Sequence, residues 1–163
     1  MRALGFLVAG VCAVAVASAT GSAATAKPVI LSYPYGRQCP AAGYENTYDR
    51  WAMSICNCTS YVAWALDANG RRVDWFEPGE MDAHNWPRVA RYAGIPTGPD
   101  ARVDAVAVWP HATPPYGHVA FVTAVHPDGT FDVAEYNLRR KYRFDARYRL
   151  SPAGVTFVYV PLR

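Results

Sequence analysis

Residues 57–70 read NCTSYVAWALDANG, and this stretch decides the class of fold. Its residues favour a helix over 58–68, and Asn69 and Gly70 form a pair that commonly ends a helix. The expected helix begins at Cys58. A cysteine in this position meets unpaired backbone N–H groups and the positive end of the helix dipole, so the stretch also marks a candidate reactive site.

Two more helices are expected in the first part of the chain, over 45–54 and 82–92. In the second of these, Trp86, Val89 and Ala90 recur at helical spacing and form one apolar face. The first part of the chain is therefore expected to supply helices that cover a sheet.

After Pro99 the pattern changes to short runs of β-type residues separated by turn residues. Pro127, Asp128 and Gly129 predict a hairpin turn within this part. Five strands are expected, over 103–109, 118–125, 130–136, 141–150 and 155–160. Helices followed by antiparallel strands predict an α+β domain, with the N-terminal helices packed on an antiparallel β-sheet.

Residues 1–26 are typical of an export signal. Arg2 supplies a positive start, an apolar run follows over 4–17, and two A-x-A cleavage sites end at Ala19 and Ala26. The apolar run is too short to span a membrane. We therefore expect a secreted protein whose cleavage falls after one of these two alanines.

What remains, residues 27–163, has the length of one domain. Cys12 follows Val11, where a lipobox has Gly or Ala, so no lipid anchor or stable membrane association is expected. Without Arg2 the chain has 15 basic and 13 acidic residues, a net charge of +2. This weak excess suits an anionic cell envelope, and no nucleic-acid partner is expected. The basic residues that cluster are interpreted as a solvated surface: Arg139, Arg140, Lys141 and Arg143.

Three cysteines remain after removal of the signal: Cys39, Cys56 and Cys58. In an oxidising compartment, an odd number indicates one disulfide and one thiol kept free. A bridge between Cys56 and Cys58 would close a very tight ring, so we expect Cys39 to pair with Cys56 and Cys58 to stay free. The bridge would pin the extended segment 27–43 to the domain.

Cys58 and His118 are the candidate reactive residues. The helix N-terminus favours thiolate over thiol in Cys58. His118 follows Gly117 and opens a strand that is apolar on both faces, and an imidazole at the mouth of a buried strand is suited to general-base work. Taken singly, each has a structural alternative, namely a buried or bridged cysteine and a hydrogen-bonded strand histidine.

Glu135 and Asn137 stand two residues apart at the end of the strand expected over 130–136, so a period of two places both on one face. If this strand lies beside the one opened by His118, an acid and an amide face the imidazole and fix its tautomer. Without that pairing they are ordinary polar residues at a strand end.

Four motifs, in order along the chain, resemble the CHAP domain family, in which a cysteine and a histidine hydrolyse amide bonds, chiefly in bacterial cell walls. They are CTSYVAW at 58–64, VAVW at 106–109, GHVAFV at 117–122 and AEYN at 134–137. The helix around Asn85 and Trp86 is also similar to a family landmark, so the resemblance covers roughly residues 30 to 160.

The resemblance implies a papain-like fold and a role for each matching residue. Cys58 would be the nucleophile and His118 its general base. Glu135 would orient the imidazole, and Asn137 would give a supporting polar contact. The backbone N–H of Cys58 would help to form an oxyanion hole.

The sequence departs from the family pattern at two places. The family usually has Gly-Asp before the VAVW strand, whereas this chain has Asp104 and Ala105. Aspartate tolerates a left-handed turn, so the fold is expected to survive. The residue before the nucleophile is often Gln in the family. Here it is Asn57, which is shorter by one methylene and is left out of the predicted site.

No metal and no cofactor are expected. Some family members carry a calcium loop of alternating acids before the nucleophile, but here Asp49 is followed at the alternate positions by Trp51 and Met53, which cannot ligate a hard cation. The other histidines, together with the cysteines, match no zinc-binding pattern. These histidines are His84, His111 and His126.

We therefore expect a secreted cysteine amidase or endopeptidase that cleaves peptidoglycan through a Cys58 acyl-enzyme. The bond would lie in the stem peptide, in the crossbridge, or between muramic acid and alanine. Two alternatives stay open: a secreted amidase-type toxin with another amide substrate, and a non-catalytic wall-binding protein on the same scaffold. A binding module has no need of a free thiol outside the cell, which argues against the latter. The sequence identifies no protein partner.

Overall fold

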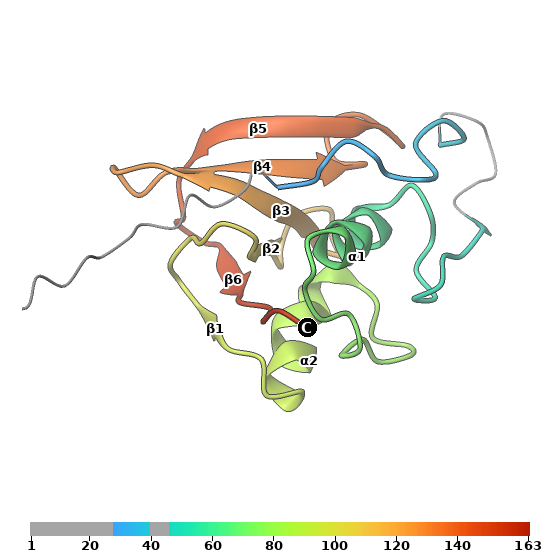
Figure 1. Ribbon diagram of the computed structural model, residues 1–163, viewed down its shortest axis with the longest axis horizontal. Helices are drawn as coiled ribbons and strands as arrows, with labels where there is room; N and C mark the ends of the chain where they lie inside the picture. The colour runs from blue at the N-terminus through green and yellow to red at the C-terminus, as the bar shows by residue number, and fades with distance from the viewer. Residues whose placement is uncertain (1–27, 40–45) are drawn as a thin grey trace, which may run out of the picture.

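In the described residues, two α-helices and one 3-10 helix pack against a six-stranded antiparallel sheet (Figure 1). The computed structural model describes residues 28–39 and 46–163. The helices are α1 (Cys58–Ala68), the 3-10 helix η2 (Ala83–Asn85) and α2 (Trp86–Tyr92). The strands are β1 (Thr97–Gly98), β2 (Val106–Trp109), β3 (His118–Val125), β4 (Phe131–Tyr136), β5 (Phe144–Leu150) and β6 (Thr156–Val158). This architecture confirms the predicted α+β fold.

The order of the strands in the sheet is β1-β6-β2-β3-β4-β5, and every neighbouring pair is antiparallel. In the ladder between β2 and β3, Trp109 lies opposite His118. In the ladder between β3 and β4, Phe121 lies opposite Ala134. The strand that carries Glu135 is therefore the neighbour of the strand that His118 opens.

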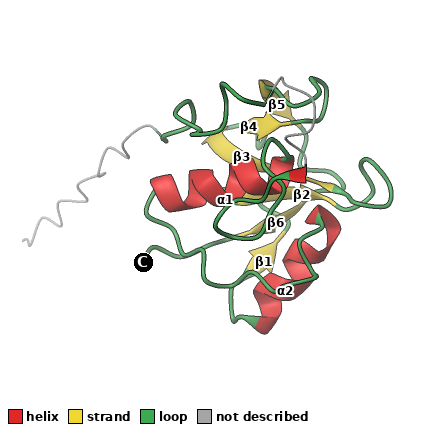
Figure 2. Cartoon of the chain, turned by 90° about the vertical axis from the view of Figure 1, so that its right-hand side faces the viewer, coloured by secondary structure: helices red, strands yellow, loops and turns green. Residues whose placement is uncertain are grey.

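The central strands bury both faces, because successive side chains point to opposite sides of the sheet. In β3, Val119 and Phe121 join the larger core, which includes Leu66 of α1. Ala120 and Val122 join a second cluster with no residue from the helices. Helix α1 lies against β3 and β4, and α2 lies against β1 and β6 (Figures 1 and 2). The strand of His118 is thus held rigidly from both sides.

Tyr33 anchors the N-terminal segment beside α1. Its ring is buried, and its hydroxyl lies 2.7 Å from Ser60 Oγ. The same oxygen accepts the backbone N–H of Cys56 at 3.0 Å. Burial raises the pKa of Tyr33 to about 12, so the hydroxyl stays neutral. Cys56 has a left-handed backbone with φ of 68°, and its hydrogen bond to Tyr33 holds this turn in place just before Cys58.

The prediction of a helix over 45–54 is wrong: in the described part, residues 46–54, the chain forms turns instead. Here Asp49 organises a tight turn: its Oδ1 accepts the N–H groups of Trp51 at 2.9 Å and of Met53 at 3.0 Å. Ala52 takes a left-handed backbone with φ of 59°. An aspartate that bonds nearby N–H groups offers the backbone an alternative to a helix, and this alternative prevails.

The other predicted elements are present, two of them with the predicted ends and the rest with shifted ends. The helix predicted over 58–68 and the strand over 118–125 match α1 and β3 at both ends. The helix over 82–92 is divided into η2 and α2, and strands β2, β4, β5 and β6 are shorter than predicted. The two-residue strand β1 was not predicted, because so short a segment carries no alternation. The left-handed turn expected at Asp104 is confirmed, with φ of 64°.

The predicted signal, residues 1–26, lies outside the described residues and stays a prediction, as does the single-domain boundary. In the described part of the chain, no helix combines the length and the apolar character needed to cross a membrane.

A disulfide joins Cys39 to Cys56, with their Cα atoms 5.2 Å apart. Cys58 is a free thiol. The bridge ties the turn over 34–39 to the segment that enters α1, which is the pairing expected from the cysteine count. It closes a loop across a sequence separation of 17 residues.

Replacing Cys39 with alanine should lower the free energy of unfolding by about 3 kcal/mol, because the bridge no longer restricts the unfolded chain. The activity of the folded variant should be affected less than its stability. Denaturant unfolding monitored by circular dichroism measures the change. The double variant Cys39→Ala/Cys56→Ala separates loss of the bridge from the effect of a new free thiol. A peptide map of the oxidised protein with Cys58 in the bridge and Cys56 labelled would contradict the pairing.

Candidate active site

Cys58 is the first residue of α1, and its side chain is partly exposed. Burial would raise the pKa of its thiol, but the positive charge of His118 and a hydrogen bond from that ring act in the opposite sense. The backbone N–H groups of Val119 and Thr59 also donate to the sulfur. Together they hold the pKa of Cys58 below its usual value, so the thiolate is favoured.

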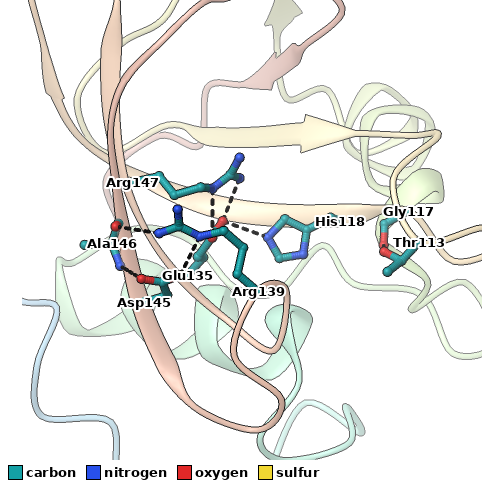
Figure 3. Close-up of polar contacts among 8 residues, drawn as sticks. All are labelled: Thr113, Gly117, His118, Glu135, Arg139, Asp145, Ala146 and Arg147. Atoms are coloured by element: carbon teal, nitrogen blue, oxygen red, sulfur yellow. Dashed lines mark hydrogen bonds and ion pairs between the residues drawn. The ribbon is translucent and has the colours of Figure 1, made fainter.

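His118 is buried at the start of β3, with 1% of its surface exposed. Its Nε2 lies 3.0 Å from Glu135 Oε2 (Figure 3), which leaves Nδ1 for the hydrogen bond with Cys58. Burial would lower the pKa of His118, but the Cys58 thiolate and Glu135 outweigh it and raise the pKa to about 9. The lowered pKa of Cys58 and the raised pKa of His118 both favour an imidazolium beside a thiolate.

Gly117 allows the loop before His118 to approach η2. It has a left-handed backbone with φ of 75°, and a Cβ there would lie 2.7 Å from the backbone nitrogen of His84. The His84 N–H donates to the Tyr116 carbonyl at 3.0 Å in the same contact. A side chain at 117 would thus push this loop away from η2.

Glu135 on β4 lies in the interior with no exposed surface. Besides His118, it binds Arg147 of β5 in a two-pronged ion pair: Arg147 Nε is 2.8 Å from Oε1, and a terminal nitrogen is 2.7 Å from Oε2 (Figure 3). Burial would raise the pKa of Glu135, but the hydrogen bonds from His118 and Arg147 hold it below its usual value. Glu135 is therefore an ionised acceptor that fixes His118.

Asn137 does not continue β4 as the period of two requires. The strand ends at Tyr136, and Asn137 takes a left-handed backbone with φ of 60°. Its side-chain nitrogen donates to Asn57 Oδ1, and its Oδ1 accepts the N–H of Tyr142 at 2.8 Å. Asn137 thus contacts the residue before Cys58 rather than sharing the strand face of Glu135. Asn57, left out by the sequence analysis, belongs to the same cluster.

A cleft of about 440 Å³ opens over these groups. Segments 48–59, 81–83 and 113–118 line it, together with Asn137. Cys58 and His118 both face the cleft, whereas Glu135 lies behind the imidazole and is not among the lining residues. Of the four predicted catalytic residues, Cys58, His118 and Asn137 therefore line the cleft, and Glu135 supports His118 from behind.

Arg147 and Trp109 are the residues that the sequence analysis missed. Trp109 lies with its ring 4.6 Å from the Arg147 guanidinium carbon and 6.0 Å from the His118 ring centre. The signal for Arg147 was indirect: a glutamate that faces the imidazole of a buried strand needs a cationic partner, and the strand expected over 141–150 offers several arginines.

Among the described residues, His84 and His126 make no hydrogen bond to Cys58, His118 or Glu135. The exposed His84 ring pairs with the Tyr116 carbonyl at 3.2 Å, and His126, just beyond β3, pairs with Asp132 at 2.8 Å. Within residues 28–39 and 46–163, no three His, Cys, Asp or Glu side chains gather closely enough to hold a metal ion. A thiolate, an imidazolium and a fixed carboxylate around a cleft are a set suited to nucleophilic acyl transfer.

Comparison with known proteins gives one family. The family model of the CHAP domain matches residues 43–137, more than half of the chain. "Probable autolysin LDP" of Staphylococcus aureus (strain NCTC 8325 / PS 47) is 30% identical over 105 residues, which are 63% of this chain and 35% of that protein. A crystal structure of N-acetylmuramoyl-L-alanine amidase from Staphylococcus aureus matches with a TM-score of 0.59 and 25% identity, over 66% of this chain and 31% of that one.

The chain spans about a third of the length of each of these two proteins. The matched region nevertheless includes α1, β2, β3 and β4, and so it contains Cys58, His118 and Glu135. The fold is papain-like, and the chain belongs to the CHAP domain family.

Proposed function

We propose that this protein is a secreted cysteine hydrolase that cleaves amide bonds of bacterial peptidoglycan through an acyl-enzyme on Cys58. The observation that carries the proposal is the contact between Cys58 and His118, backed by Glu135, at the wall of the cleft. A cysteine with a purely structural role, in a disulfide or in an apolar core, does not require an imidazolium in contact with its sulfur.

In the first step, the Cys58 thiolate attacks the carbonyl carbon of an amide bound in the cleft. The backbone N–H of Cys58, which as the first N–H of a helix has no partner within it, would donate to the oxyanion. His118 then gives its Nδ1 proton to the departing amine as the C–N bond breaks, and a thioester remains on Cys58.

In the second step, a water molecule attacks the thioester. His118, now neutral, takes a proton from this water, and the carboxylic acid leaves as the thiolate is released. The imidazolium is thereby regenerated. Throughout both steps Glu135 accepts the N–H at Nε2 and keeps the ring in one orientation.

The relatives support peptidoglycan as the substrate class, since one is called an autolysin and another an N-acetylmuramoyl-L-alanine amidase. The leader-like residues 1–26 support export to the compartment where this polymer lies. Two residues that line the cleft, Tyr48 and Tyr116, are exposed, so the cleft opens to solvent on a side that a polymer can approach.

Digestion of purified peptidoglycans that differ in their crossbridge tests the proposal. Mass spectrometry should find soluble fragments with one new amine and one new carboxylate for each bond cut. Cleavage between muramic acid and alanine would free an alanine amine, whereas cleavage in the stem peptide or crossbridge would free an amine of the peptide. The matched control is the same protein alkylated with iodoacetamide. Undiminished release after alkylation, or no release from any peptidoglycan, would contradict the proposal.

A further inference from the structure

Arg147 lies behind the candidate catalytic pair without touching the cleft. Its guanidinium makes two hydrogen bonds to Glu135, and its side chain retains 16% exposure. The Arg147 guanidinium also lies over the ring of Trp109, which adjoins His118. The four side chains thus form a closed cluster, which Figure 3 shows for the three charged members.

Burial makes this cation necessary. Glu135 has no exposed surface, and a carboxylate in such a place either finds positive partners or takes up a proton. His118 alone is an unsuitable partner, because the proton between Nε2 and Oε2 could then move onto the carboxylate. That transfer would leave a neutral imidazole beside Cys58 and remove the charge that stabilises the thiolate.

The charges around the cluster alternate in sign. Cys58 and His118 form one pair, and Glu135 and Arg147 form the next. Arg139, from the turn between β4 and β5, also acts on Glu135 electrostatically, but it is exposed and binds Asp145 at 2.7 Å.

The cleft side adds one carboxylate. Asp82 lines the cleft, is exposed, and makes no ion pair among the described residues. Besides His118, Arg147 is therefore the partly buried cation that balances Glu135, while the exposed charges are screened by water.

We infer that Arg147 is a positioning residue of the catalytic site: its two-pronged ion pair keeps Glu135 ionised and fixed against Nε2 of His118, so that the imidazolium can stabilise the Cys58 thiolate. This inference rests on the proposed function for its meaning in catalysis. Its physical content, the control of the thiolate by Arg147, does not depend on any substrate.

Loss of the Arg147 charge should disfavour the thiolate by either of two routes. If Glu135 stays ionised, its uncompensated negative charge opposes a second negative charge on Cys58. If Glu135 takes up a proton, His118 loses its counter-ion and stabilises the thiolate less. Both routes move formation of the thiolate to higher pH.

The experiment measures the rate of Cys58 alkylation by iodoacetamide as a function of pH, with labelling located by peptide mapping. The rate rises with pH where the Cys58 thiol loses its proton, and this rise is the acid step of the profile. In Arg147→Met, the acid step should move to higher pH by about one unit or more. Arg147→Lys keeps the charge and should restore most of the acid step. It loses the two-pronged geometry, so its kcat on peptidoglycan should still fall.

Arg139→Met is the matched control, because it removes an arginine of the same hairpin that is exposed and does not bind Glu135. Its acid step should stay within a few tenths of a unit of the wild type, as expected for a screened charge. Circular dichroism checks that each variant is folded. Should Arg147→Met not fold, Arg147→Lys and the following double variant carry the test.

The double variant Arg147→Met/Glu135→Gln removes both members of the ion pair. If Arg147 acts through Glu135, the added loss of Arg147 should shift the acid step little beyond Glu135→Gln alone. Equal shifts in Arg147→Met and Arg139→Met, or full additivity with Glu135→Gln, would overturn the inference. Absence of peptidoglycan cleavage with a normal Arg147 effect on alkylation would instead contradict the proposed function alone.

Discussion

Cys58→Ser should lower kcat/KM for peptidoglycan by about 10³-fold or more while leaving the fold intact. The hydroxyl of serine stays protonated at neutral pH, and the cluster around His118 is arranged to stabilise a thiolate, not to remove the proton of an alcohol. Sulfur and oxygen differ little in size, so packing at the start of α1 should hardly change. The release of fragments from labelled peptidoglycan measures the loss.

The double variant Cys39→Ala/Cys56→Ala controls for the loss of sulfur in this region. It removes the disulfide and keeps Cys58, so it should retain kcat/KM at a temperature where it is folded. Thermal unfolding of all three proteins separates lost chemistry from lost structure. Activity of Cys58→Ser within tenfold of the wild type would remove Cys58 from the mechanism and leave the family relation without its expected chemistry.

The elements that position the candidate nucleophile were predictable because local and tertiary preferences agree there. Helix α1 follows from its residue preferences and from the pair Asn69 and Gly70 at its end. Strand β3 follows from an apolar run too continuous to face water, and its first five residues are indeed buried. The contact of Glu135 with His118 then required only that β3 and β4 be neighbours, which their hairpin turn indicates.

The segment before α1 could not be predicted by the same reasoning. Residues 46–54 contain helix-compatible side chains, but the Asp49 carboxylate captures two backbone N–H groups and the chain turns instead. Just after this segment, the Tyr33 hydroxyl holds the Cys56 N–H from a distant part of the sequence. A local pattern carries no information on such a contact.

Arg147 escaped prediction for a different reason. The sequence of β5 alternates charged and apolar residues in a way typical of a solvent-facing edge strand, and most of its side chains are indeed partly exposed. Only the register between β4 and β5 reveals that Arg147, opposite Val133, reaches the buried Glu135. Register at the edge of a sheet depends on bulges and turn lengths, and here it shifts between Phe131 and Val133.

The last prediction concerns His118 and the pH range in which the site can work. The reactive form needs a thiolate and an imidazolium together, so it exists above the lowered pKa of Cys58 and below the pKa of His118, about 9. For the wild type, kcat/KM should therefore fall on the acid side as the thiolate takes up a proton. It should fall again above about pH 9, because a neutral imidazole has no proton to give to the departing amine.

His118→Gln should remove both features. Glutamine carries no charge to stabilise the thiolate and cannot donate a proton to the amine, so kcat/KM should fall by roughly 10²- to 10⁴-fold. Alkylation of Cys58 should then follow a single step at higher pH than in the wild type, because burial still raises the pKa of the thiol and only the N–H groups lower it. His126→Gln is the matched control, since His126 is also paired with a carboxylate but lies beyond the opposite end of β3. An unchanged alkylation profile in His118→Gln would show that the helix N-terminus and the N–H groups alone hold the thiolate, and His118 would lose its place as the partner of Cys58.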